Sequence, residues 1–122
     1  MPKQNEYCDY LMDRLVPLGA PSYRFMFGGY AIYVDGLIIG IVADDVLMLR
    51  ADDENRPDYE ARGIGPFQPY PEKGMGTMPY YIVPDEILED QDELIRWAER
   101  SREAALRAQA KKGKGKRGAT PK

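Results

Sequence analysis

Five acidic residues are the side chains best suited to metal or acid–base chemistry, and they fall in two nearby clusters: Asp44, Asp45, Asp52, Asp53 and Glu54. Hard divalent cations need several oxygens converging at about 2.0–2.6 Å. The spacing fits no EF-hand loop, the first pair suits a turn, and the other three suit a helix cap. We therefore expect no metal site and no cofactor. An enzyme using carboxylates such as Asp52 and Asp53 is kept as a third hypothesis.

The chain contains no histidine and a single cysteine, Cys8. This excludes Ser–His and Cys–His nucleophile pairs, and it also excludes zinc sites built from histidine or from four cysteines. Cys8 lies on the apolar stripe of a predicted helix, so we interpret it as a small buried hydrophobe rather than a reactive thiol. The composition predicts a protein that is not an enzyme.

The Gly28-Gly29 pair has two interpretations. A phosphate-binding loop places its glycines between a strand and a helix, usually followed by Lys and Ser or Thr. Here residues typical of strands stand on both sides. We therefore predict a β-bulge within a single strand at this point.

Basic residues are concentrated at the C-terminus. Residues 111–122 hold six basic side chains and no acid, whereas the other 110 residues hold 11 basic and 20 acidic ones. Because glycines interrupt this segment, we predict a disordered basic tail over residues 107–122. Such a tail would bind nucleic acid nonspecifically through its phosphates, or would serve only to keep the chain soluble. The nucleic-acid hypothesis assigns the contacts to Lys111, Lys112, Lys114, Lys116 and Arg117.

The rest of the chain alternates between helical and strand-like patterns. Apolar residues at spacings of three and four predict an amphipathic helix over residues 5–18, and acids before Pro57 predict a short helix that ends at Gly63. Turn signals at Asp35-Gly36 and Asp44-Asp45 separate the first strands. The predicted order is α-β-β-β-α-β-β-α, a two-layer α+β domain over residues 1–106 with helices packed on an antiparallel sheet. Its strands are predicted at residues 23–34 (bulged), 37–43, 46–50, 67–70 and 77–83, and its last helix from residue 84. Within that helix the spacing predicts i,i+4 ion pairs Asp92–Arg96 and Glu103–Arg107.

The predicted strand Leu37–Ala43 is apolar on both faces, so one layer of helices would leave one of its faces uncovered. Either helices lie on both sides of the sheet or a second subunit packs there, and we favour a homodimer. The side chains assigned to a partner interface are Arg24, Tyr30, Tyr80 and Tyr81. Because neighbouring residues of a strand alternate, Tyr80 and Tyr81 are predicted to point to opposite faces of the sheet. This strand is also the longest apolar run, too short to cross a membrane, and no secretory signal precedes the domain, so we expect a cytoplasmic protein.

Three blocks of sequence resemble a known family: residues 24–36 (RFMFGGYAIYVDG), residues 51–60 (ADDENRPDYE) and residues 78–84 (MPYYIVP), with Leu94 and Trp97-Ala98 in the last helix. In order and separation they are similar to the N-terminal domain of the TfoX/Sxy competence regulators, from about Tyr7 to Arg102. Ala31 stands where the family commonly has glycine.

The resemblance implies a bacterial, cytoplasmic α+β domain linked to the control of DNA uptake. Full-length members act as transcriptional coactivators alongside the cyclic-AMP receptor protein, and the family supplies no catalytic residues. Those members continue into a second helical domain, whereas this chain ends in a short Lys/Gly tail, so competence control does not transfer directly. Our leading hypothesis is a regulatory protein-interaction module, dimeric and engaging transcription machinery. The alternative is nonspecific DNA or RNA binding through the tail.

Overall fold

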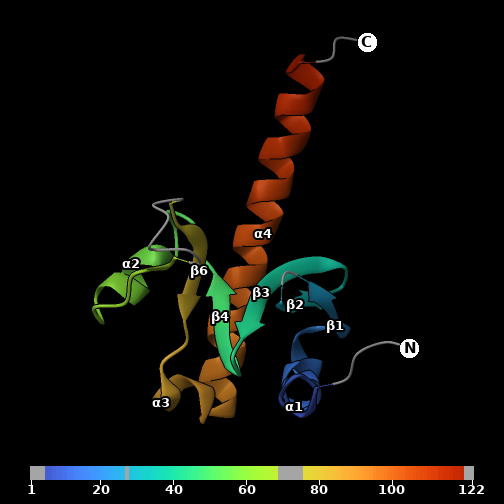
Figure 1. The fold of residues 1–122 in the computed structure, drawn as a ribbon. Helices are drawn as coiled ribbons and strands as arrows, with labels where there is room; N and C mark the ends of the chain where they lie inside the picture. Colours follow the sequence, from blue (N-terminus) through green and yellow to red (C-terminus); the bar gives the residue numbers. More distant parts are fainter. Residues whose placement is uncertain (1–4, 27, 69–75, 120–122) are drawn as a thin grey trace.

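The computed structural model describes residues 5–26, 28–68 and 76–119, with the backbone alone described over 112–119. Its centre is a six-stranded sheet in the order β1-β2-β3-β4-β6-β5, and every neighbouring pair is antiparallel (Figure 1). The strands are β1 (Pro21–Met26), β2 (Gly29–Val34), β3 (Leu37–Ala43), β4 (Val46–Arg50), β5 (Pro66–Phe67) and β6 (Met78–Ile82). The predicted antiparallel α+β fold is confirmed.

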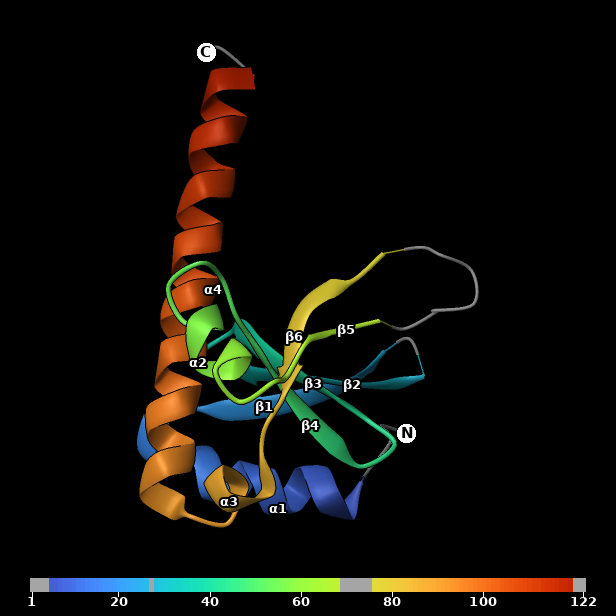
Figure 2. The ribbon, with the colours of Figure 1, turned by 90° about the vertical axis from the view of Figure 1, so that its left-hand side faces the viewer.

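The helices lie on one side of this sheet. They are α1 (Glu6–Leu15), the 3₁₀ turn η1 (Val16–Leu18), α2 (Arg56–Glu60), α3 (Asp85–Leu88) and α4 (Gln91–Ala119). Figure 2 shows α1, α3 and the first half of α4 gathered on the same side. Fully buried side chains from α1, β2, β3, β4 and α4 form the main core, among them Leu11, Ile32, Ile39, Leu49 and Leu94. In a smaller cluster, Tyr59 of α2 packs with Ala51 and with Tyr81 of β6.

The first two strands form a hairpin, so the predicted β-bulge at Gly28-Gly29 is wrong. Met26 pairs with Gly29, and Gly28 has φ 77°, a turn conformation that glycine adopts without strain. Gly29 is required for a different reason, because a Cβ there would lie 2.5 Å from the carbonyl oxygen of Val42. The glycine pair therefore serves a turn and a close approach of β3. The predicted turns at Asp35-Gly36 and Asp44-Asp45 are confirmed.

The first helix forms as the sequence predicts. Asn5 is its N-cap, and the Asn5 side chain accepts a hydrogen bond of 2.9 Å from the Cys8 amide. Cys8 is fully buried, and this burial raises the pKa of its thiol to about 11. The thiol is therefore protonated at neutral pH, as expected of a packing residue rather than a nucleophile.

The end of the chain differs from the prediction in two ways. The single helix expected from residue 84 is two helices, α3 and α4, and the Asp90 carboxylate caps α4 by accepting from the Glu93 amide at 3.1 Å. The backbone of α4 then continues to Ala119, where the sequence had predicted disorder from residue 107. Once a helix is nucleated, each added residue contributes one hydrogen bond, and a glycine weakens it by about 1 kcal/mol without forbidding it.

Candidate interaction surfaces

The five acidic residues do not converge. Asp44 and Asp45 form the turn between β3 and β4, whereas Asp52, Asp53 and Glu54 follow the other end of β4. Five residues of strand separate the two groups by roughly 17 Å. Among the described residues, no set of three or more His, Cys, Asp or Glu side chains is placed to hold a metal ion.

Two of these acids form ion pairs instead. Arg107 of α4 donates from Nε to Asp52 Oδ2 at 2.7 Å and from its terminal nitrogen to Oδ1 at 2.9 Å. Asp53 binds the nearby Arg56 at 2.5 Å. The hydrogen bond from Arg107 lowers the pKa of Asp52. Because the folded-state pKa is depressed, the Asp52–Arg107 pair stabilises the fold at neutral pH, and that stabilisation is lost as the pH falls through the folded pKa.

A second arginine of α4 strengthens the same attachment. Arg100 binds the carboxylate of Asp58 and donates to the Glu54 carbonyl at 3.2 Å. Arg100 and Arg107 are seven residues apart, so they lie on one face of the helix two turns from each other. We call Arg100 and Arg107, with Asp52 and Asp58, the arginine clamp. It fixes α4 against the β4–α2 segment.

Asn55 organises the segment that the clamp holds. Its side chain is 2 % exposed, accepts from the Asp52 amide at 2.8 Å and donates to the Arg50 carbonyl at 3.2 Å. These bonds fix the Asp52 backbone where the Asp52 carboxylate meets Arg107. The sequence predicted a helix cap in this region, but it did not predict that the region binds α4. Arg107 lies 55 residues after Asp52, and the local spacing had paired Arg107 with Glu103.

Beyond the clamp, α4 leaves the domain and continues past the sheet (Figures 1 and 2). Lys111 is exposed there. The other predicted nucleic-acid contacts are Lys112, Lys114, Lys116 and Arg117. They occupy the helical backbone of the same segment, and their side chains lie outside the described residues. The structure thus places the basic run on a projecting element.

The opposite face of the sheet carries no helix in the described chain. Strand register aligns Arg24, Ala31, Ile41, Met48 and Ile82 in one row across it. We call this surface the open face. Its further side chains lie two or four residues along the strands from that row or on β5, and they include Met26, Ala43, Val46, Arg50, Phe67, Met78 and Tyr80.

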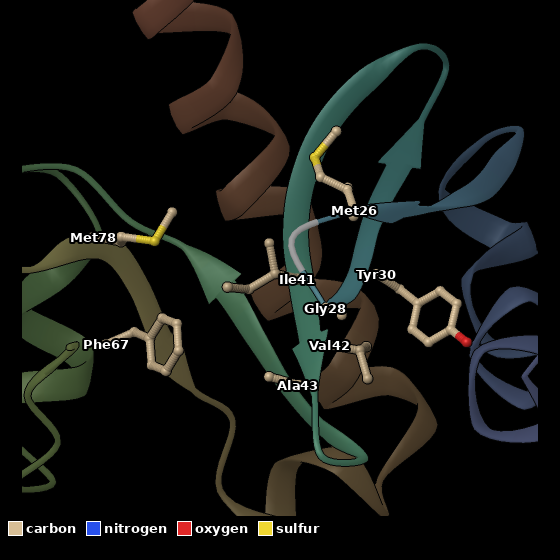
Figure 3. Close-up of a pocket in the computed structure, with 10 residues that line it drawn as sticks. Met26, Gly28, Tyr30, Ile41, Val42, Ala43, Phe67 and Met78 are labelled. Carbon is tan, nitrogen blue, oxygen red and sulfur yellow. The ribbon is translucent and has the colours of Figure 1, made fainter. Parts of the chain in front are cut away.

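A hollow of roughly 450 Å³ lies on the open face between the β1–β2 hairpin and the β5–β6 pair. Met26 lines one side, Ile41 and Ala43 the floor, and Phe67 and Met78 the other side (Figure 3). The hollow is apolar. Ile82 and Val46, elsewhere on this face, are 49 % and 37 % exposed. An apolar surface of this kind is typical of a binding site rather than of a solvated sheet.

The four residues assigned to a partner interface divide between the two faces. Arg24 and Tyr80 lie on the open face. Tyr30 packs against the main core and Tyr81 stacks on Tyr59 with ring centroids 5.1 Å apart, so both belong to the helix-covered face. The sequence predicted that Tyr80 and Tyr81 point to opposite faces, which is confirmed. Met48 and Ile82 were not predicted to lie on the open face, although the alternation of side chains along β4 and β6 indicates it.

The model of the TfoX N-terminal domain matches residues 13–105, which is more than half of the chain. The chain belongs to the TfoX N-terminal domain family. It is 32 % identical over 94 residues to Protein Sxy of Escherichia coli (strain K12), a match covering 76 % of this chain and 44 % of Sxy. It is also 31 % identical over 84 residues to an uncharacterized 12.7 kDa protein in the trpE 5′ region of Spirochaeta aurantia, covering 69 % of this chain and 67 % of that protein.

The family match confirms the resemblance inferred from three sequence blocks. In the structure of this TfoX N-terminal domain, the three blocks form the β1–β2 and β2–β3 hairpins, the Asn55 segment, and β6. Because the matched region covers less than half of Sxy, the activity and partners of that protein are not facts about this chain. None of the described helices has a stretch long and apolar enough to cross a bilayer.

Proposed function

We propose that this TfoX N-terminal domain is a non-enzymatic regulatory module of the bacterial cytoplasm that presents the projecting part of α4 to a partner in the transcription machinery. Membership of the family supports a regulatory role. The observation that carries the proposal is that α4 runs 29 residues, from Gln91 to Ala119, while the sheet supports only its first part. A helix that only closed a core would end where the core ends.

The arginine clamp supports this role because it sets the direction of the projecting segment. Leu94, Ala98, Ser101 and Ala104 are fully buried along the first part of α4. Arg107 is held by Asp52 just before the helix leaves the domain. A contact element whose base is fixed loses less conformational entropy on binding than a free tail would.

The test measures binding to a DNA duplex that carries the cyclic-AMP receptor protein, the partner class implied by the family resemblance. We expect the full chain to bind the receptor–DNA complex, and the chain cut after Ala110 to bind at least about tenfold more weakly because the projecting segment is missing. A matched control, R62Q/R96Q, removes two positive charges from the domain and should bind like the parent. Equal binding by the cut and full chains would contradict the proposal.

Nonspecific nucleic-acid binding is a second candidate, favoured by the five basic residues at positions 111–117 of the projecting segment. The same binding measurement, made on duplex DNA without the receptor protein, separates this candidate from the proposed function. This candidate predicts binding without the receptor protein that disappears after truncation and weakens steeply with salt, since each neutralised phosphate releases counterions. Binding to bare duplex that is insensitive to salt would contradict it.

A further inference from the structure

We propose that the open face of the sheet is the interface with a second copy of this chain. The inference is independent of the role of α4. It starts from the distribution of helices: all those described lie on one face, so the alternative that helices straddle the sheet does not hold for the described chain. No described helix covers the apolar row from Ala31 to Ile82. Within it Ile82 is 49 % exposed and Ile41 is partly exposed, whereas Ala31 and Met48 are buried.

Most of the described arginines are held in ion pairs, but those of the open face are not, and Arg14 on α1 also lacks one. Six arginines, on α2, α4 and the loop after α2, lie within 4.0 Å of a carboxylate. Within the described residues, Arg24 and Arg50 have no such ion pair. Their recorded contacts are with aromatic residues, Arg24 over the ring of Tyr33 and Arg50 over that of Tyr80, each at 5.9 Å.

Unpaired acids lie at the rim of the same face. Asp44 directly follows Ala43, which lines the apolar hollow, and it is exposed. In the described part of the chain no basic side chain forms an ion pair with Asp44 or with its neighbour Asp45.

The presence of both charges on one surface favours a second copy over a foreign partner. In a two-fold interface residue i contacts residue j, and j contacts i, so the surface must carry both members of each pair. Arg24 of one copy and Asp44 of the other would then form two equivalent pairs at the edges of a shared apolar centre. A foreign protein would have to supply these charges itself.

Sedimentation equilibrium of the full chain tests this inference, over roughly 5 to 500 μM to span micromolar dissociation constants. We expect a reversible shift from the 13.9 kDa monomer to twice that mass. R24E and D44K should each weaken the dimer at least about tenfold, because each places like charges together. The double variant R24E/D44K should recover the parent association, since the reversed pair is again complementary. I82D should also weaken the dimer by burying a charge.

Two controls keep the outcome interpretable. R96E reverses a charge on the exposed side of α4 and should leave the dimer unchanged, and circular dichroism melting establishes that each variant is folded. A chain that stays monomeric over the whole concentration range overturns the inference. So does a dimer that R24E, D44K and I82D leave intact. Neither result bears on binding of the chain to the receptor–DNA complex, which is read in a separate assay.

Discussion

L94A is expected to lower the free energy of unfolding by about 2–5 kcal/mol, the usual cost of a large cavity in a core. Leu94 is fully buried where α4 packs against the sheet. Its truncation removes apolar contacts from the centre of the main core, and the surrounding β-strands can close the space only in part. Equilibrium urea denaturation at one fixed protein concentration gives the value, because association would otherwise alter apparent stability.

The matched control is L106A on the same helix. Leu106 is 43 % exposed, and alanine has a high helix propensity, so this change should stay within about 0.5 kcal/mol. Equal losses for L94A and L106A would mean that the face of α4 carrying Leu94 is not the one packed on the sheet.

G40A is expected to destabilise the protein by about 1–3 kcal/mol or to prevent it from accumulating in folded form. An added Cβ at position 40 would lie 2.5 Å from the carbonyl oxygen of Met48 and 3.1 Å from a methyl carbon of Leu49. The Met48 oxygen belongs to the backbone of β4, which is paired on both sides, so it cannot move away without disturbing the sheet. Thermal and urea unfolding measure the loss.

G65A is the control for this prediction. A Cβ at position 65 meets no atom within 4 Å, and the residue does not require a left-handed backbone. Its replacement should be neutral or slightly stabilising, because alanine has less conformational freedom than glycine in the unfolded chain. A G40A protein as stable as G65A would show that β3 and β4 do not approach as closely as described.

Local patterns in the sequence were sufficient for most of the elements. The period of α1 and the turns at Asp35-Gly36 and Asp44-Asp45 depend on residues a few positions apart, and all were predicted. The Gly28-Gly29 region failed because a bulge and a tight hairpin have the same local composition. They differ only in whether the flanking segments pair with each other, and the sequence does not state that pairing.

The candidate surfaces were less predictable because they depend on contacts between distant segments. Arg107 was expected to pair with Glu103 one turn away, yet it binds Asp52 on another segment. Alternation predicted that Tyr80 and Tyr81 face opposite ways, but it could not say which of them lies under the helices. The open face could not be predicted from the sequence, because it depends on the strand register that aligns Arg24, Ile41 and Ile82 from three strands.

Hydrogen–deuterium exchange of the full chain, free and bound to the receptor–DNA complex, tests most directly whether the projecting part of α4 is the contact element. We expect binding to slow amide exchange over residues 108–119, with no change in the buried turns around Leu94 and Ala98 or in β1 and β6 of the open face. Protection confined to the open face, with residues 108–119 exchanging as in the free chain, would contradict the proposed role of α4.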